Sequence, residues 1–204
     1  MDLLPTELID HIIYFTQNTI FDLSLVNKYF TNRVKIIRIT DNENYPAMED
    51  KHLKELLNIS SLIIDKNRLL TNIISLTNLK SLRLKDNQLT TNKDLSKLSK
   101  LTQLDIEYCY QIRDKGISSL TNLTSLRLVD NSTITNEGIS NLTNLTSLVL
   151  INNFKINVEG VESLPNLTYF EIAGAYYPHL SESNLFPRMP KTPGLIINNQ
   201  IIGI

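Results

Sequence analysis

A twelve-residue phrase occurs twice in this sequence. Residues 120–131 read LTNLTSLRLVDN, residues 142–153 read LTNLTSLVLINN, and the second copy begins 22 positions after the first. A fixed period of roughly 20 to 30 residues is typical of solenoids, in which each unit is one structural turn that buries its apolar face against a neighbouring unit. The repetition therefore constrains the fold more than any other feature of the chain.

Further copies align on the pattern L-x-x-L-x-L-x-x-N. The clear copies are Leu79/Leu82/Leu84/Asn87, Leu101/Leu104/Ile106/Cys109, Leu123/Leu126/Leu128/Asn131 and Leu145/Leu148/Leu150/Asn153. The looser copies are Val34/Ile37/Ile39/Asn42, Ile59/Leu62/Ile64/Asn67, Leu167/Phe170/Ile172/Ala175 and Thr192/Leu195/Ile197/Gln200. Successive copies start 25, 20, 22, 22, 22, 22 and 25 residues apart, so the array spans residues 34–204.

This pattern resembles the leucine-rich repeat family. The resemblance implies an α/β solenoid with a parallel sheet on its concave face and short helices on its convex face. We expect residues 34–204 to form this solenoid, with residues from about 175 to 204 as a degenerate C-terminal capping repeat.

Each copy contains a short strand pattern followed by a ladder position. The L-x-L segment alternates apolar and polar residues, which is the period of a strand with one buried face. In leucine-rich repeats the Asn side chain after the strand bonds backbone groups of adjoining turns, which would otherwise cost about 1 to 3 kcal/mol each. Cys109, the only cysteine, occupies this slot. The slot favours a small buried thiol over a catalytic one.

The other half of each copy predicts a short convex helix. Thr135 or Asp114 can cap such a helix, and Ile139 with its equivalents then points inward. One slot in this half holds Gly116, Gly138 or Gly160, whereas the segment NKDLSKL holds Asp94 there. Since both residue types tolerate left-handed backbone, the slot is compatible with a tight turn.

The strand residues outside the buried set face the concave surface, where repeat proteins usually bind partners. One row reads Ile63, Arg83, Asp105, Arg127, Val149, Glu171, and the next reads Asp65, Lys85, Glu107, Val129, Ile151, Ala173. Because neighbouring strands lie about 4.8 Å apart, the first row predicts a lateral charge ladder. The ladder either contacts a partner or only keeps the sheet soluble.

An apolar patch follows the charged positions. We expect it to comprise Val129, Val149, Ile151, Ala173 and Tyr169. Exposed contiguous apolar surface tends to mark a partner site, and Tyr176 and Tyr177 with Arg127 would add hot-spot chemistry. Alternatively, the segment YYPHLSESNLFPRMPKTPG folds over this patch. The predicted target-binding residues are Arg83, Asp105, Arg127, Val129, Val149, Ile151, Tyr169, Glu171, Tyr176 and Tyr177.

Residues 1–33 do not fit the repeat. The segment LPTELIDHIIYF (4–15) predicts an amphipathic helix, and IFDLSLVNKYF (20–30) predicts a second one. The Leu-Pro opening followed by the second helix resembles the F-box. The matching positions are Leu4, Pro5, Leu8, Ile9, Ile12, Leu25, Val26 and Phe30.

The F-box resemblance implies docking to the Skp-type adaptor of a cullin-RING ubiquitin ligase. F-boxes ordinarily continue into a third helix, whereas here Val34 already begins a repeat. The alternative is that residues 1–33 form an amphipathic cap on the open end of the solenoid.

The sequence gives little support for metal binding, catalysis, or binding to nucleic acid or membranes. The three histidines, His11, His52 and His179, are far apart, and no Cys/His cluster has metal spacing. The sequence has no G-x-S-x-G motif and no Gly-rich phosphate-binding loop, so we expect neither catalysis nor a cofactor. A net charge of -1 gives no electrostatic case for nucleic acid or an anionic membrane. The charged residues beside Asp105 and Glu107 argue against catalytic tuning of their pKa values.

The sequence therefore predicts a monomeric protein-binding molecule. We expect it in the cytoplasm, because the acidic start MDLLPTELID does not resemble a secretory signal. An Asn- and Ile-rich composition is compatible with an A+T-rich genome, including that of a large virus, whose protein would work in the host cytoplasm. The first hypothesis is a substrate-recognition adaptor of a ubiquitin ligase. The rivals are a stand-alone scaffold or decoy, and a regulator that blocks an enzyme through the same surface.

Overall fold

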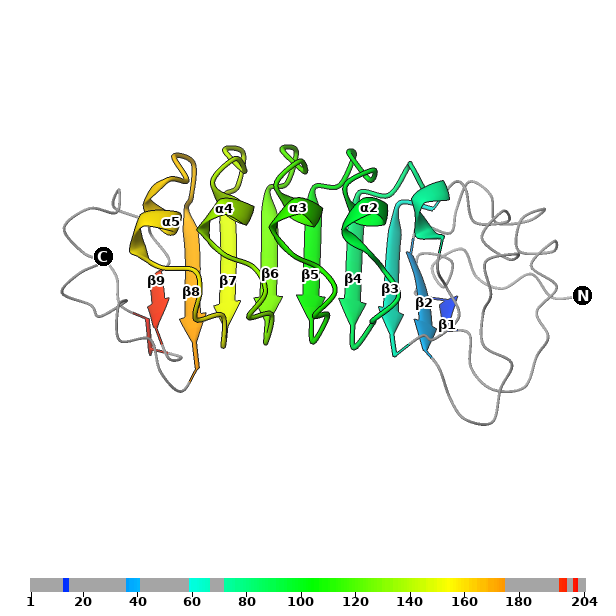
Figure 1. Ribbon diagram of the computed structural model, residues 1–204, viewed down its shortest axis with the longest axis horizontal. Helices are drawn as coiled ribbons and strands as arrows, with labels where there is room; N and C mark the ends of the chain where they lie inside the picture. Colours follow the sequence, from blue (N-terminus) through cyan, green and yellow to red (C-terminus); the bar gives the residue numbers. More distant parts are fainter. Residues whose placement is uncertain are drawn as a thin grey trace, which may run out of the picture.

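The computed structural model describes residues 13–14, 36–40, 59–66, 72–174, 195–197 and 200–201. The described strands form one sheet in which each strand lies beside its neighbour in sequence, β1 through β10 (Figure 1). Their bounds are β1 Ile13–Tyr14, β2 Ile36–Thr40, β3 Ser61–Asp65, β4 Ser81–Lys85, β5 Gln103–Glu107, β6 Ser125–Val129, β7 Ser147–Ile151, β8 Tyr169–Ala173, β9 Leu195–Ile197 and β10 Gln200–Ile201.

The pairing register follows the repeat alignment from β2 to β9. Leu104 of β5 pairs with Leu126 of β6, and Phe170 of β8 pairs with Leu195 of β9, as the aligned copies require. All these neighbours are parallel, whereas β10 pairs antiparallel with β9. The predicted solenoid with a parallel sheet is confirmed.

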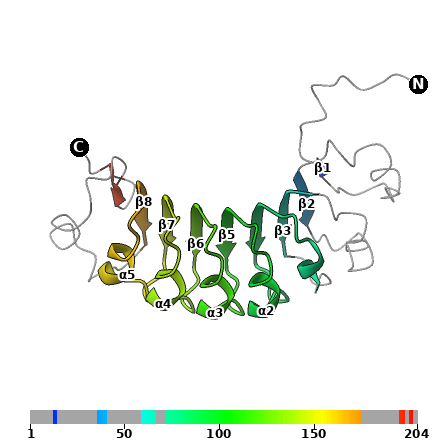
Figure 2. The ribbon, with the colours of Figure 1, turned by 90° about the horizontal axis from the view of Figure 1, so that it is seen from above.

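Short helices lie on the opposite side of the repeats from β3 to β8. They are the 3-10 helix η3 Ile73–Ser75 and the α-helices α2 Asn92–Leu95, α3 Asp114–Ile117, α4 Asn136–Ile139 and α5 Val158–Glu162. Seen from above, the strands line the inner side of an arc and the helices lie on its outer side (Figure 2). The sheet is therefore the concave face.

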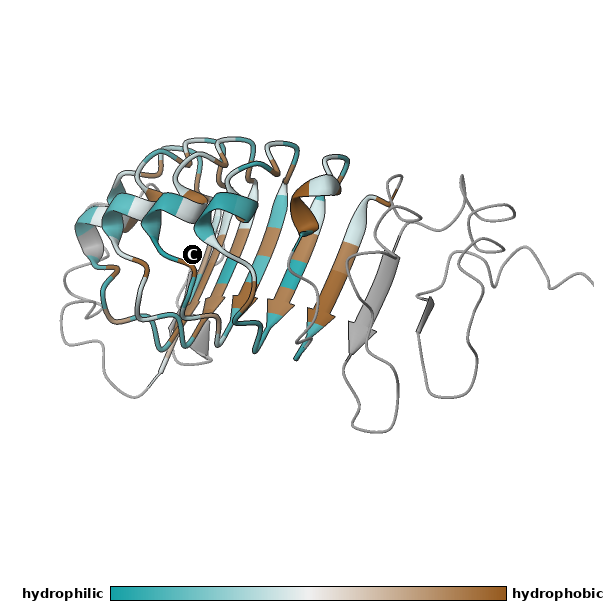
Figure 3. Ribbon diagram, turned by 45° about the vertical axis from the view of Figure 1, so that its right-hand side comes forward, coloured by the Kyte–Doolittle hydropathy of each residue, from teal (hydrophilic) through white to brown (hydrophobic). Residues whose placement is uncertain are grey.

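Buried leucines and isoleucines fill the space between sheet and helices. Along β4, Leu82 and Leu84 are at most 1% exposed, and the residues between and beside them are half-buried. The apolar and polar residues alternate along the strands in Figure 3, as a half-buried strand requires. One continuous core therefore runs through the described repeats.

The Asn residues that follow β4, β6 and β7 form the predicted buried ladder, since Asn87, Asn131 and Asn153 are fully buried. The Asn131 side chain accepts from the backbone N–H of Cys109 (3.1 Å) and donates to the carbonyl oxygens of Ile106 (2.7 Å) and Val129 (2.9 Å). Asn153 repeats this arrangement one turn later, since it accepts from the Asn131 N–H at 3.0 Å. Each amide thus satisfies backbone groups of two adjacent repeats.

Cys109 replaces Asn in this ladder. Its Sγ lies 3.2 Å from the carbonyl oxygen of Glu107 and 3.6 Å from that of Leu84, so the thiol takes over the donor side of the amide. Burial raises the pKa of the Cys109 thiol to about 11. Both observations support the structural interpretation of this cysteine.

The repeated phrase TNLT forms hydrogen bonds between repeats in the segments that lead into the strands. Thr124 Oγ1 donates to the carbonyl oxygen of Thr102 at 3.1 Å, and Thr146 Oγ1 donates to that of Thr124 at 3.0 Å. The Asn122 amide donates to the Ser99 carbonyl oxygen at 2.9 Å. The same residues of the phrase thus bond each of these repeats to the preceding one.

The shared glycine slot is not a left-handed turn, so that expectation was wrong. Gly138 lies in α4, and a Cβ there would stand 2.6 Å from Asp114 Oδ1 and 3.2 Å from the Asp114 Cα. Asp114 Oδ1 accepts from the Thr135 N–H at 2.7 Å, which fixes it against Gly138. Close packing of adjacent helices therefore selects glycine.

Left-handed residues directly follow the strands β3 to β7 instead. Lys66, Asp86, Tyr108, Asp130 and Asn152 have φ between 46° and 56°. Sequence analysis missed this position, because only three of the five residues, Asp86, Asp130 and Asn152, are of types typical of left-handed backbone.

The cap predictions were half right. The Thr135 side chain accepts from the Glu137 N–H and so caps α4, as expected. Asp114 is not a cap; it is the first residue of α3, and its carboxylate bonds the next repeat.

At the N-terminal end, the predicted helix over residues 4–15 is contradicted at Ile13 and Tyr14. These two residues form β1, which pairs in parallel with Ile37 and Arg38 of β2. A β-branched and an aromatic residue suit a strand that extends the sheet by one position.

Candidate protein-binding surface

The concave face carries the two predicted rows of side chains. The register pairs Ile63, Arg83, Asp105, Arg127, Val149 and Glu171 in one row, and Asp65, Lys85, Glu107, Val129, Ile151 and Ala173 in the other. Because each strand contributes one residue to each row, side chains 22 positions apart in sequence become neighbours.

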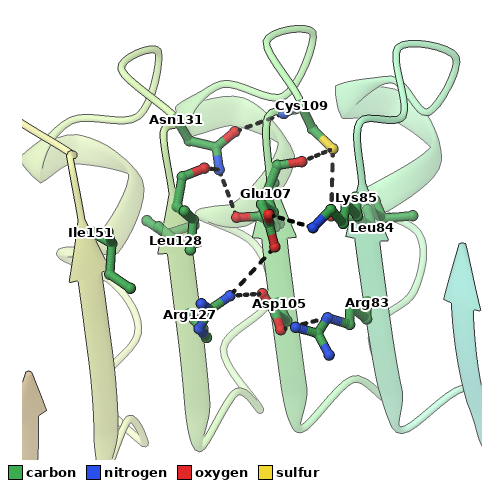
Figure 4. A network of polar contacts seen from close by, with 12 residues as sticks. Arg83, Leu84, Lys85, Asp105, Glu107, Cys109, Arg127, Leu128, Asn131 and Ile151 are labelled. Atoms are coloured by element: carbon green, nitrogen blue, oxygen red, sulfur yellow. Dashed lines mark hydrogen bonds and ion pairs between the residues drawn. The ribbon is translucent and has the colours of Figure 1, made fainter. Parts of the chain in front are cut away.

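The first row contains the predicted charge ladder. Asp105 lies between two arginines, with Oδ2 3.0 Å from Arg83 Nε and Oδ1 3.1 Å from Arg127 Nη1 (Figure 4). One carboxylate on β5 thus joins cations from β4 and β6.

The second row adds another carboxylate to the same network. Glu107 Oε1 lies 2.8 Å from Lys85 Nζ, and Oε2 lies 3.8 Å from Arg127 Nη1 (Figure 4). The hydrogen bond to Glu107 and its charge raise the pKa of Lys85, and the nearby charge of Asp65 acts in the same direction. Arg127 is therefore shared by both carboxylates.

The cations of this network are more exposed than its carboxylates. The side chains of Arg83 and Arg127 are 42% and 33% exposed, against 21% for Asp105 and 12% for Glu107. Exposed ion pairs contribute about 0 to 1 kcal/mol each to stability. The network therefore presents basic groups to solvent and stabilises the fold only a little.

The concave face becomes less polar beyond β6. Val149 and Ile151 on β7 are half-buried, as are Tyr169 and Ala173 on β8. The Tyr169 hydroxyl donates to Glu171 Oε2 at 2.8 Å, and this bond raises the pKa of Tyr169. These residues form an apolar half beside the charged half.

Val129 differs from the other residues predicted for the apolar patch. It is 7% exposed, so it packs within the surface and does not form part of the exposed patch. Its register neighbours are Glu107 and Ile151, whose side chains flank it on either strand. A short β-branched side chain between two longer ones is easily covered.

Three exposed aromatic residues were missed by sequence analysis. Tyr108, Tyr110 and Phe154 are 39%, 47% and 50% exposed and follow the ends of β5 and β7. Asp130 lies next to Tyr108, and its charge and hydrogen bond raise the pKa of the phenol. Tyr108 stands at a variable position of the L-x-x-L-x-L-x-x-N pattern, and Tyr110 and Phe154 directly follow it, so the pattern gave no signal for any of the three.

Several predicted site residues lie outside the described residues. These are Leu4, Pro5, Leu8, Ile9, Ile12, Leu25, Val26 and Phe30 of the F-box-like segment, and Tyr176 and Tyr177 of the concave set. The same holds for the three histidines.

Other kinds of site find no support in the described repeats. Among the described residues no group of three or more His, Cys, Asp or Glu side chains could hold a metal ion. No helix in the described part of the chain has the length and hydrophobicity needed to cross a membrane.

Comparison with known proteins agrees with this architecture. A family model described as Leucine Rich repeat matches residues 97–120 and 119–142. The fold is a leucine-rich-repeat solenoid. No curated protein matches the chain.

Solved structures of other leucine-rich-repeat solenoids are similar. An internalin from Listeria monocytogenes shares 24% identity with a TM-score of 0.58, covering 82% of this chain and 49% of that one. An internalin C2 from the same organism shares 28% identity with a TM-score of 0.55, covering 81% of this chain and 72% of that one.

Rad7, from a structure of the Rad7 and Elc1 complex in yeast, shares 22% identity with a TM-score of 0.62, and the alignment covers 88% of this chain and 51% of Rad7. This chain therefore spans about half the length of Rad7 and of the first internalin. These likenesses concern the fold.

Proposed function

We propose that this chain is a non-catalytic protein-binding molecule whose concave face holds a partner protein. The observation that carries the proposal is the change of chemistry along one sheet, from the ion network of Asp105 and Glu107 to the apolar half around Val149 and Ile151. Protein interfaces combine apolar anchors with charged groups that fix orientation. The leucine-rich repeats themselves favour protein–protein interaction.

The finer proposal is a substrate-recognition adaptor of a cullin-RING ubiquitin ligase. In this proposal residues 1–33 dock to a Skp-type adaptor, the concave face holds the target, and partner subunits transfer ubiquitin. Joining target and ligase raises their effective concentration. The support is the F-box-like pattern in the sequence, and the fact that Rad7, which has a similar fold, was solved in a complex with Elc1.

A second candidate is a stand-alone binding scaffold whose N-terminal segment only caps the solenoid. One observation favours it: Ile13–Tyr14 pairs with β2 and so extends the repeat sheet at its open end. Such arrays need terminal caps, because an uncovered end exposes apolar core and strand edge.

Co-expression with a eukaryotic Skp-type adaptor, followed by size-exclusion chromatography, separates the two candidates. The parent chain should elute with the adaptor, and the double variant Pro5→Ala/Leu8→Asp should not, with an unchanged circular dichroism spectrum. Lys115→Gln on the convex helix α3 serves as the control and should still elute with the adaptor. Absence of a complex with the parent, together with unfolding of the double variant, would leave the capped scaffold as the function.

A further inference from the structure

The ion network has more hydrogen-bond donors than its acceptors take up. Each arginine offers five N–H groups and a lysine three. Asp105 and Glu107 have four carboxylate oxygens between them, and each of these already lies within 3.8 Å of a cation of the network. The hydrogen-bonding groups that remain available in the network are therefore mostly N–H donors. A ligand that matches them must supply hydrogen-bond acceptors.

The donors also lie on the solvent side of the network. Arg83 and Arg127 are each more exposed than the carboxylate they share, at 42% and 33% against 21% for Asp105. Lys85 differs, because Asp65 on β3 and Glu107 on β5 flank it by register. Lys85 is 39% exposed, but only the two guanidinium groups offer paired donors that match a carboxylate, so they are the sites of the face that can bind one in a bidentate manner.

The positions of the two arginines set the shape of a matching ligand. Arg83 and Arg127 lie on strands separated by β5, which places their backbones about 10 Å apart. A segment in the extended polyproline II conformation rises about 3.1 Å per residue with three residues per turn, so its side chains at positions i and i+3 lie on the same side at about this distance. Beyond Arg127, the next residue of the same row is Val149, and Ile151 lies beside it on β7.

We propose that the concave face binds an extended acidic segment of a partner protein. Two carboxylates about three residues apart meet Arg83 and Arg127, and an apolar side chain further along the segment contacts Val149 and Ile151. Charge-assisted, bidentate pairs between arginine and carboxylate supply the specificity. This inference rests on the proposed function, since it names the partner chemistry of the same face.

Selection from a random twelve-residue peptide display library tests the inference with the full chain as bait. We expect enrichment of Asp and Glu at two positions about three residues apart, with an apolar residue on one side. A synthetic peptide of that composition should bind in fluorescence anisotropy, and its affinity should fall when salt is raised, because screening weakens such pairs.

Four variants identify the surface that binds the peptide. Arg83→Gln and Arg127→Gln should each weaken binding about tenfold, a change of about 1.4 kcal/mol. Ile151→Asp should weaken it at least as much. Lys115→Gln, which removes an exposed cation of the convex face, should leave the affinity unchanged.

The outcomes separate this inference from the proposed function. Selected peptides without acidic enrichment, or no selected peptide, overturn the acidic segment as ligand. Loss of binding in Ile151→Asp but not in the arginine variants overturns it too, while the concave face remains the binding surface. Binding that none of the three concave variants changes contradicts both proposals.

Discussion

The buried interior of the repeat stack and its concave surface differ in whether equivalent positions carry the same residue type. At the buried strand positions the same residue type recurs, as in Leu104, Leu126 and Leu148. On the concave row between them, β5, β6 and β7 carry Asp105, Arg127 and Val149. A buried residue packs against its copies in both neighbouring repeats, so its identity is constrained twice. A concave side chain lacks this double constraint, because it is partly exposed and ion pairs of this kind contribute about 0 to 1 kcal/mol each.

Among changes to the buried interior, removal of a ladder amide should lower the free energy of unfolding most. Asn131→Ala removes three hydrogen bonds and leaves the buried N–H of Cys109 without an acceptor. We expect the free energy of unfolding in urea to fall by about 3 kcal/mol. Asn122→Ala, the same change at an exposed amide, should cost less than about 1 kcal/mol. Equal losses for the two variants would remove the contrast between buried and exposed amides.

A methyl group at the glycine slot should have the next largest effect. Gly138→Ala places its Cβ against Asp114, so the gain in helix propensity of about 1 kcal/mol is exceeded by overpacking. We expect a net loss of about 1 to 2 kcal/mol, measured by thermal or urea unfolding. Ser140→Ala, an exposed change at the end of the same helix, should stay within about 0.5 kcal/mol. A stabilised Gly138→Ala would show that the neighbouring helix moves aside at little cost.

Cys109, which replaces Asn in the buried ladder, should make the free energy of unfolding depend on pH. The Cys109 thiol has a pKa of about 11 in the folded chain, against an ordinary value of 9.0. Above pH 9 the unfolded chain therefore loses this proton first, and stability falls as pH rises towards 11. We expect the contribution at pH 10 to be about 1 kcal/mol lower than at pH 7.

Cys109→Asn provides the control for this pH effect, because Asn fills the same slot in the next two repeats. Under reducing conditions this variant should lose less stability between pH 7 and pH 10 than the parent. The same loss in both chains would assign the effect to other groups.

The smallest expected effect concerns the left-handed position. Tyr108 has φ of 55°, where Asn152 stands two repeats later. Tyr108→Asn should raise the free energy of unfolding by roughly 0.5 kcal/mol, because Asn tolerates this backbone better, offset by the lost contact with Asp130. Tyr110→Asn, a nearby exposed aromatic, should show no gain. A destabilised Tyr108→Asn would indicate that the contact with Asp130 outweighs backbone strain.

The sequence predicted the strands and their register because two periods act together. The alternation within L-x-L fixes which side is buried, and the repeat length fixes which residues become neighbours. Together they predict Arg83, Asp105 and Arg127 in one row, and the ion pairs confirm it. The ladder role of Asn131 followed from the resemblance to leucine-rich repeats.

Contacts between neighbouring repeats on the convex side could not be predicted in the same way. The glycine slot depends on the distance between Gly138 and Asp114, which no periodicity encodes. The burial of Val129 likewise depends on the lengths of the flanking side chains.

The strand at Ile13 was missed because an apolar run is equally compatible with one face of a helix.

We propose that the concave ion network serves recognition and not folding. Urea unfolding of the triple variant Arg83→Gln/Asp105→Asn/Arg127→Gln, which neutralises the first row of the network, tests this proposal. We expect the free energy of unfolding to stay within about 1 kcal/mol of that of the parent chain. A loss of about 3 kcal/mol, as large as that expected for Asn131→Ala, would contradict it and make the network part of what holds the stack together.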